Sequence, residues 1–175
     1  MKRTAVVLLF ILSFTLFAAA QQDKSKRPSP PAQAQCKLPD GKTITTDYSS
    51  PRAKGRQIFG GLVPYNEVWR TGANEATTFV TTANLNVEGK DVPAGSYTIF
   101  TVPAQDKWTL IINKKTGEWG IPYHYESDEL VRVPMQVGKT SGPVENFTIN
   151  YDQSSGCTLQ ISWENTQASV KFTEK

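Results

Sequence analysis

The sequence predicts an all-β fold, a single antiparallel β-sandwich of jelly-roll or barrel-like form with about nine or ten strands. Three observations support this prediction. Apolar and polar residues alternate with a period of two along several segments, as in strands that bury one face. Turn-forming residues separate these segments at short intervals. No segment between them is long enough to hold the crossover helix that a parallel sheet requires.

The predicted elements follow in chain order. Residues 64–70 are the one helix-like stretch, and we expect a short helical segment of about two turns there. Apolar, β-branched and aromatic residues crowd 97–102 and 108–112, which indicates inner strands that are partly covered on both faces. Apolar and polar residues alternate clearly in three later predicted strands, at 147–151, 157–164 and 170–172. The clearest case is 157–164, in which Leu159, Ile161 and Trp163 lie between polar neighbours. Turn signals that link the strands as hairpins lie at 40–41, 88–89, 93–95, 113–117, 138 and 154–156.

The charge of the chain argues against a nucleic-acid-binding protein. The 175 residues include 19 Lys and Arg and 16 Asp and Glu, for a formal net charge of +3. Five of the basic residues and one of the acidic residues precede Cys36, so the remainder is close to neutral. Proteins that bind nucleic acid carry a basic excess. We therefore expect no nucleic-acid partner.

The N-terminal residues have the pattern of a secretory signal. In residues 1–20, Lys2 and Arg3 precede an apolar stretch, and Ala18 to Ala20 provide a cleavage site. The apolar stretch is shorter than the roughly 20 residues that span a bilayer, so we expect no stable transmembrane segment after cleavage. Residues 21–35 are rich in Pro and Gln and are expected to form a disordered linker, and residues 36–175 the β-sandwich domain. The predicted location is periplasmic or extracellular.

The two cysteines of the chain are predicted to pair. An exported protein meets an oxidising compartment, in which thiols form lasting disulfides. A Cys36–Cys157 disulfide would tie the first part of the domain to a late strand. Two unpaired buried thiols remain the alternative.

The densest group of unusual residues lies at 60–77, between glycines and outside any strand alternation. Loops on a rigid sheet often carry binding residues. An arginine there could grip a carboxylate or phosphate, and aromatic rings could stack on a sugar or another ring. The candidate ligand-binding residues are Tyr65, Glu67, Trp69, Arg70, Asn74 and Glu75. In the alternative, Trp69 caps the core while Arg70 and Glu75 pair with each other.

The sequence offers little support for catalysis. It contains no Gly-x-Ser-x-Gly, His-Glu-x-x-His, P-loop or dinucleotide-binding motif, so we assign no catalytic residue and expect no cofactor. One histidine and two cysteines are too few for most zinc sites, and we predict no metal site. Glu67 and Glu75 could still form a glycosidase pair across a groove. His124 could act as a general base in an aromatic loop at 119–126 that would form one wall of a ligand groove.

Several long motifs resemble one bacterial family in the same order along the chain. They are YSSPR at 48–52, GRQIFGGLVPY at 55–65, EVWRTGANEAT at 67–77, PAGSYTIFT at 93–101 and WTLIIN at 108–113. This pattern resembles the bacterial domain of unknown function 2911, over most of residues 36–175. The resemblance implies an exported bacterial protein, and the family brings no established activity to these positions.

Three functional hypotheses follow from the sequence. The first is an exported β-sandwich that binds a small ligand, a glycan or an envelope protein through the 65–75 loop without catalysis. The second is an envelope glycan or peptide hydrolase that uses the carboxylates of this loop or His124. The third is a purely structural domain in which the loop is buried.

Overall fold

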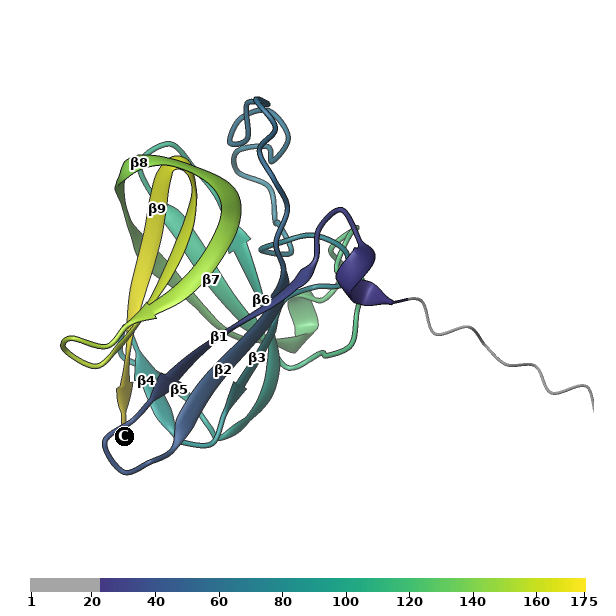
Figure 1. Cartoon of the computed structure of the whole chain (residues 1–175). Coiled ribbons are helices and arrows are strands. Elements are labelled where there is room, and N and C mark those ends of the chain that lie inside the picture. The colour runs from purple at the N-terminus through teal and green to yellow at the C-terminus, as the bar shows by residue number, and fades with distance from the viewer. Residues whose placement is uncertain (1–22) are drawn as a thin grey trace, which may run out of the picture.

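The computed structural model describes residues 23–175, so the predicted signal peptide at 1–20 lies outside the described residues. Within this part of the chain, nine strands form one sheet in the order β1-β2-β3-β6-β7-β8-β9-β4-β5 (Figure 1). Every neighbouring pair is antiparallel, as predicted. The strands are β1 (Pro31–Lys37), β2 (Thr43–Ser49), β3 (Thr78–Thr81), β4 (Leu85–Val87), β5 (Lys90–Val92), β6 (Gly95–Val102), β7 (Trp108–Asn113), β8 (Glu129–Asp152) and β9 (Cys157–Glu174); the 3-10 helices are η1 (Lys24–Lys26) and η2 (Glu126–Asp128).

The long strand β8 turns the sheet into a sandwich. Its first part pairs with β7 up to Met135, and from Gln136 onward it pairs with β9 instead. The register shifts twice between Lys139 and Thr148, and irregularities of this kind bend a strand and increase its twist. Figure 1 shows β8 and β9 curling over the strands β6 and β7. The predicted β-sandwich is therefore confirmed.

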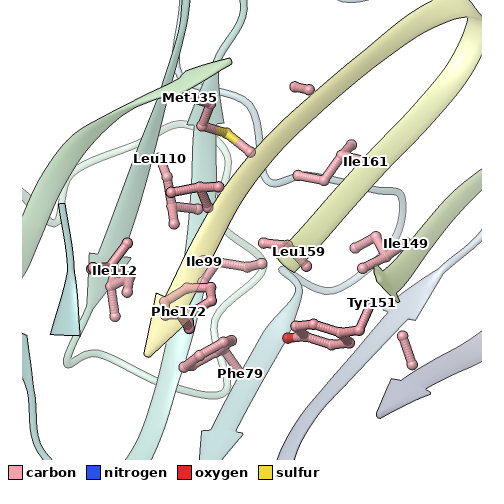
Figure 2. Close-up of a cluster of buried hydrophobic side chains, with 14 of the residues drawn as sticks. Phe79, Ile99, Leu110, Ile112, Met135, Ile149, Tyr151, Leu159, Ile161 and Phe172 are labelled. Atoms are coloured by element: carbon pink, nitrogen blue, oxygen red, sulfur yellow. The ribbon is translucent and has the colours of Figure 1, made fainter. Parts of the chain in front are cut away.

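One layer of the sandwich holds β1, β2, β3, β6, β7 and the first part of β8, and the other holds the rest of β8 with β9, β4 and β5. The core lies between these two layers (Figure 2). Phe79, Ile99 and Leu110 face it from the β3–β6–β7 layer, and Leu159 and Phe172 face it from β9. The rings of Phe79 and Phe172 lie 5.2 Å apart. Along β9, the alternation read from the sequence is confirmed: Leu159, Ile161 and Trp163 are buried, and the residues between them are half-exposed.

A disulfide joins the two layers. Cys36 in β1 and Cys157 in β9 form it, with their Cα atoms 5.9 Å apart, and both side chains are buried. The predicted pairing is confirmed, and the alternative of two free thiols is wrong.

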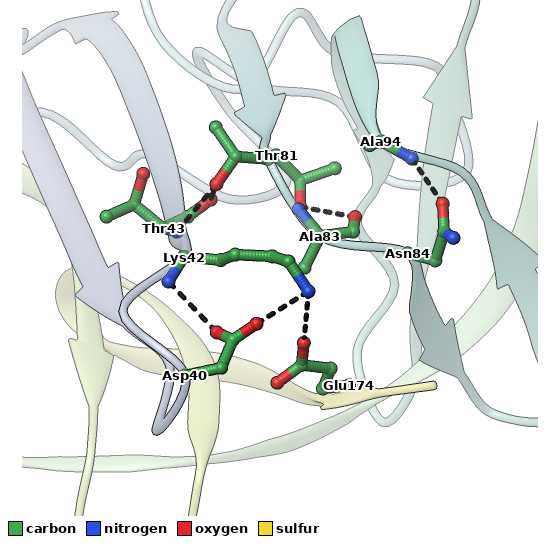
Figure 3. A network of polar contacts seen from close by, with 9 residues as sticks. Asp40, Lys42, Thr43, Thr81, Ala83, Asn84, Ala94 and Glu174 are labelled. Atoms are coloured by element: carbon green, nitrogen blue, oxygen red, sulfur yellow. Dashed lines mark hydrogen bonds and ion pairs between the residues drawn. The ribbon is translucent and has the colours of Figure 1, made fainter.

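Ion pairs at one end of the sandwich also join the layers (Figure 3). The Lys42 ammonium, in the turn between β1 and β2, contacts Asp40 of the same turn and Glu174 at the end of β9, 2.9 Å away. Nearby, the Asn84 side chain accepts a hydrogen bond from the Ala94 N–H at 2.9 Å. The ion pair between Lys42 and Glu174 holds the C-terminal strand β9 at its last residues.

The linker prediction for residues 21–35 is wrong where it meets β1. The strand begins at Pro31, and Ala34 is buried in it. The Pro30 carbonyl accepts a hydrogen bond from the Ser50 N–H. Small alanines alternate with glutamines here, which suits a strand beside a crowded core but lacks the large apolar residues that mark a strand in a sequence. Pro31 is tolerated because it is the first residue of the strand.

The short helical segment predicted at 64–70 is also wrong: these residues form turns and a bridge. Trp69 pairs with Thr101 of β6 through two backbone hydrogen bonds of 2.8 and 2.9 Å. Asn66 has a positive φ of 63°, which a right-handed helix does not allow. A partner distant in the sequence thus decides the backbone conformation of this segment.

Replacing Cys36 and Cys157 together by alanine is expected to lower the free energy of unfolding by about 4 to 5 kcal/mol, because the disulfide closes a loop with a sequence separation of 121 residues. Urea unfolding of the purified protein measures this difference. Wild-type protein treated with a reductant is the control and should fall to the same stability. An unchanged unfolding midpoint in both samples would contradict a stabilising role of the disulfide.

Candidate functional site

The connection between β2 and β3, residues 50–77, closes one end of the sandwich. In Figure 1 it rises beyond the ends of the strands before the chain returns to β3. Ile58, Phe59, Val63 and Trp69 within it are buried. The Ala53 N–H donates to the Glu145 carbonyl, and the Ile58 N–H donates to the Glu164 carboxylate. The connection is therefore packed against the sandwich along much of its length.

Trp69 anchors this connection in an aromatic cluster. Its indole is stacked on Trp163 with ring centroids 6.1 Å apart, and it meets Phe147 edge-on at 5.1 Å. The indole N–H donates to the Gly72 carbonyl at 3.1 Å. Only 7% of Trp69 is exposed, so its main contribution is to the core, as in the alternative in which it caps the core.

The backbone after Trp69 turns sharply and is held by short polar contacts. Thr71 has a φ of 56°, unusual for a β-branched residue, and its hydroxyl lies 3.1 Å from that of Thr101. The Thr77 hydroxyl donates to the Thr71 carbonyl at 2.7 Å. At Gly72, with a φ of 154°, a Cβ would approach the Ser49 carbonyl oxygen to 3.0 Å. These contacts fix the point from which the Arg70 side chain projects.

The Arg70 guanidinium is half-buried without a polar partner. It makes no hydrogen bond or ion pair with any residue in 23–175, and it lies over the Trp119 ring at 5.0 Å from the ring centroid. Burial lowers the pKa of Arg70, although the nearby negative charge of Glu75 opposes this effect. The guanidinium donors thus have no acceptor among the described residues.

Gly120 brings the loop before β8 against Arg70. Its φ is +87°, and a Cβ there would lie 2.8 Å from the Ala76 Cβ and 3.2 Å from the Arg70 Cβ. The Ala76 N–H donates to the Glu118 carbonyl at 3.1 Å. Only glycine fits this close approach without displacement, and it sets the Trp119 ring beside the guanidinium.

A pocket of about 450 Å³ opens next to Arg70, and we call it the Arg70 pocket. Large apolar side chains are exposed at three positions among residues 23–175: Leu62 at 47%, Trp119 at 55% and Ile121 at 45%. Leu62 and Ile121 line the pocket, and Trp119 contacts its arginine. Its other lining residues are Ser29, Pro51, Arg56, Val63, Pro64, Glu67, Val68, Trp69, Gly72, Ala73 and Trp163.

Glu75 is engaged elsewhere. The Arg27 guanidinium contacts both of its carboxylate oxygens, at 2.8 and 3.0 Å, and the Lys24 ammonium lies 3.2 Å away. A hydrogen bond from its own backbone, with those from Arg27 and Lys24, lowers the pKa of Glu75 to about 2 against the opposing effect of burial. The Asn74 amide donates to the Ser29 carbonyl at 3.0 Å. Both residues therefore fasten the N-terminal segment, and Glu75 pairs with Arg27 rather than with Arg70.

The other predicted site residues are divided among separate places. Glu67 is exposed and lines the Arg70 pocket. Tyr65 lines a second pocket of about 490 Å³ with Asp106 and Lys139, and its ring occupies space that any side chain at Gly60 would need. His124 is exposed on the loop before β8 and makes no hydrogen bond with another described residue.

Leu62, Ile121, Arg56 and Ser29 line the same pocket as Arg70 and were not among the candidate ligand-binding residues, although Ile121 belongs to the 119–126 loop predicted to form one wall of a ligand groove. An apolar side chain next to glycine in an irregular segment, as at Leu62 and Ile121, is the signal that could have found two of them. Within the described range, no three His, Cys, Asp or Glu side chains gather closely enough to hold a metal ion. No helix formed by residues 23–175 has the length and apolar character to cross a membrane.

Glu75→Gln is expected to make stability less dependent on pH. The folded-state pKa of Glu75 is about 2, below the ordinary 4.5, so its carboxylate stabilises the fold above about pH 4.5 and loses this effect as the pH falls toward 2. Because the side chain is 41% exposed, solvent screening limits the effect to at most about 1 kcal/mol. Urea unfolding at about pH 7 and about pH 3 measures it. A difference between wild type and variant that is as large at the lower pH would contradict this assignment.

Comparison with known proteins gives one family. A family model described as "Protein of unknown function (DUF2911)" matches residues 29–172, which is most of the chain. No curated protein and no solved structure matched. The matched region begins shortly before β1 and ends within β9, so it spans the whole sandwich. The chain therefore belongs to the DUF2911 family.

Proposed function

We propose that this chain is an exported, non-catalytic binding protein that takes a small ligand with an apolar portion into the Arg70 pocket. One observation carries the proposal: of the three exposed large apolar side chains of residues 23–175, Leu62 and Ile121 line this one pocket, and the third, Trp119, lies against the guanidinium of its Arg70. Scattered apolar side chains are common on protein surfaces, whereas a group of them around a hollow marks a binding site. The volume of about 450 Å³ lies in the range of small-molecule pockets.

The walls of the pocket are rigid, which favours binding. Trp69 and Trp163 form part of its lining and belong to the aromatic core. Gly120 and the hydrogen bond between Ala76 and Glu118 hold the loop that carries Trp119 and Ile121. A site that is already formed loses little conformational entropy when a ligand binds.

A non-catalytic role agrees with the carboxylates of the loop. Glu67 and Glu75 line different pockets, and Glu75 is held as an anion by Arg27 and Lys24. A glycosidase pair requires two carboxylates across one groove, one of them protonated at working pH. The hydrolase hypothesis therefore gains no support from these residues.

Export is supported by two features of the chain. Residues 1–20 have the composition of a secretory signal. The Cys36–Cys157 disulfide suits an oxidising compartment outside the cytoplasm.

The uncharged fluorescent probe N-phenyl-1-naphthylamine is expected to bind the purified domain and to gain fluorescence. The double variant Leu62→Ser, Ile121→Ser should weaken binding by about tenfold or more, because each lost side chain buries roughly 50 Å² of apolar area against the probe. Tyr65→Ala, in the second pocket, is the matched control and should bind as wild type. Circular dichroism checks that each variant is folded. Absence of binding, or equal binding by the double variant, would contradict the proposal and favour a structural role.

A further inference from the structure

We infer that the ligand of the Arg70 pocket carries one carboxylate joined to an apolar chain or ring, and that Arg70 binds this carboxylate. The inference rests on the proposed function and adds the chemical class of the ligand. It rests on the free donors of the Arg70 guanidinium and on the charged and apolar side chains that line the pocket with it.

Arg70 has unused hydrogen-bonding capacity. A guanidinium has five N–H donors in a planar fork that matches a carboxylate. Within residues 23–175, none of these donors has a protein acceptor, and the contact to Trp119 is with the face of a ring. Half-burying a guanidinium whose donors have no protein acceptor is costly even with the charge of Glu75 nearby, and an anion that accepts hydrogen bonds in the pocket would offset that cost.

The other charged groups that line the pocket are Arg56 and Glu67. Arg56 donates to the carbonyls of Ala53 and Arg52, at 3.0 and 2.6 Å, so part of its fork is already used. Glu67 brings a negative charge to the same pocket and has no ion-pair partner among the described residues. One free guanidinium beside a carboxylate suits a ligand with a single negative charge better than a doubly charged phosphate.

The apolar lining of the pocket favours a ligand with an apolar part. Leu62, Val63 and Ile121 line the pocket together with Trp69 and Trp163. An ion alone would leave these side chains uncovered, and an apolar molecule alone would leave the guanidinium without an acceptor. A molecule with a carboxylate and an apolar part meets both requirements, because the carboxylate can accept hydrogen bonds from Arg70 while the apolar part covers Leu62 and Ile121.

Displacement of N-phenyl-1-naphthylamine by octanoate and by 1-octanol tests this inference at neutral pH. The two competitors share the same chain length and differ in the charged end. We expect octanoate to compete about tenfold or more better than 1-octanol with the wild-type protein, since charge-assisted hydrogen bonds contribute in this range. Arg70→Gln should reverse the order, because the carboxylate would then lose its hydration without gaining a partner. Arg70→Lys should keep only part of the preference, because an ammonium lacks the two-donor fork.

Two matched variants localise the effect. Lys139→Gln removes an exposed positive charge from the second pocket and should change the octanoate preference by less than about threefold. Glu67→Gln should increase the preference for octanoate, because a negative charge that repels the carboxylate is removed from the pocket. These variants retain the residues that hold the fold, and circular dichroism verifies their folding.

The outcomes separate the two proposals. If the probe does not bind the wild-type protein, the proposed function fails. If the probe binds but 1-octanol competes as well as octanoate, or if the octanoate preference survives Arg70→Gln, only the carboxylate inference is overturned. Tighter competition by octyl phosphate than by octanoate would also overturn it, because the site would then prefer a doubly charged group.

Discussion

The packing of Trp69 against Trp163 is the contact on which the candidate site depends. It fastens the 50–77 connection to β9, and the bridge between Trp69 and Thr101 fastens the same residue to β6. Both layers of the sandwich are thus joined through one side chain and its backbone. Arg70 is the next residue in the chain, so the fixed position of the buried Trp69 places Arg70 beside the pocket. The same indole supplies part of the pocket lining, which links the core to the site.

The sandwich brings together segments that are far apart in the chain. Ser29 precedes β1, Leu62 and Arg70 belong to the 50–77 connection, Ile121 precedes β8, and Trp163 lies in β9. Ion pairs from Arg27 and Lys24 to Glu75 hold the N-terminal segment at this end of the molecule. A rigid β scaffold with a site built from its connections is a common way to combine stability with a binding function.

The fold was largely predictable because strand alternation is a local signal. Leu159, Ile161 and Trp163 face the core as their spacing indicates, and the pairing of Cys36 with Cys157 followed from the count of cysteines and the expected compartment. Segments shaped by distant partners were not predictable. Trp69 lies in an extended bridge because Thr101 offers its backbone, and Ala34 is buried because its side of β1 packs in the core of the sandwich. No local pattern carries that information.

The site was predictable only in part, for the same reason. Arg70 could be identified as a ligand-binding candidate from its place in an irregular, residue-rich loop. The absence of an ion pair between Arg70 and Glu75 could not be predicted, because Glu75 pairs with Arg27, which lies in a segment whose composition resembles a linker. The contribution of Leu62 and Ile121 depends on the approach of two loops, which Gly120 allows through its contacts with Ala76 and Arg70.

The most direct measurement is a nuclear magnetic resonance titration of the isotope-labelled domain with octanoate, following the indole N–H signals of its four tryptophans and the Nε–H signals of its arginines. Trp119 is the exposed tryptophan and contacts Arg70. The account predicts saturable shifts of the Trp119 and Arg70 signals, with the buried Trp108 signal little changed. Shifts confined to residues of the second pocket, or no saturable shift at Arg70, would contradict it.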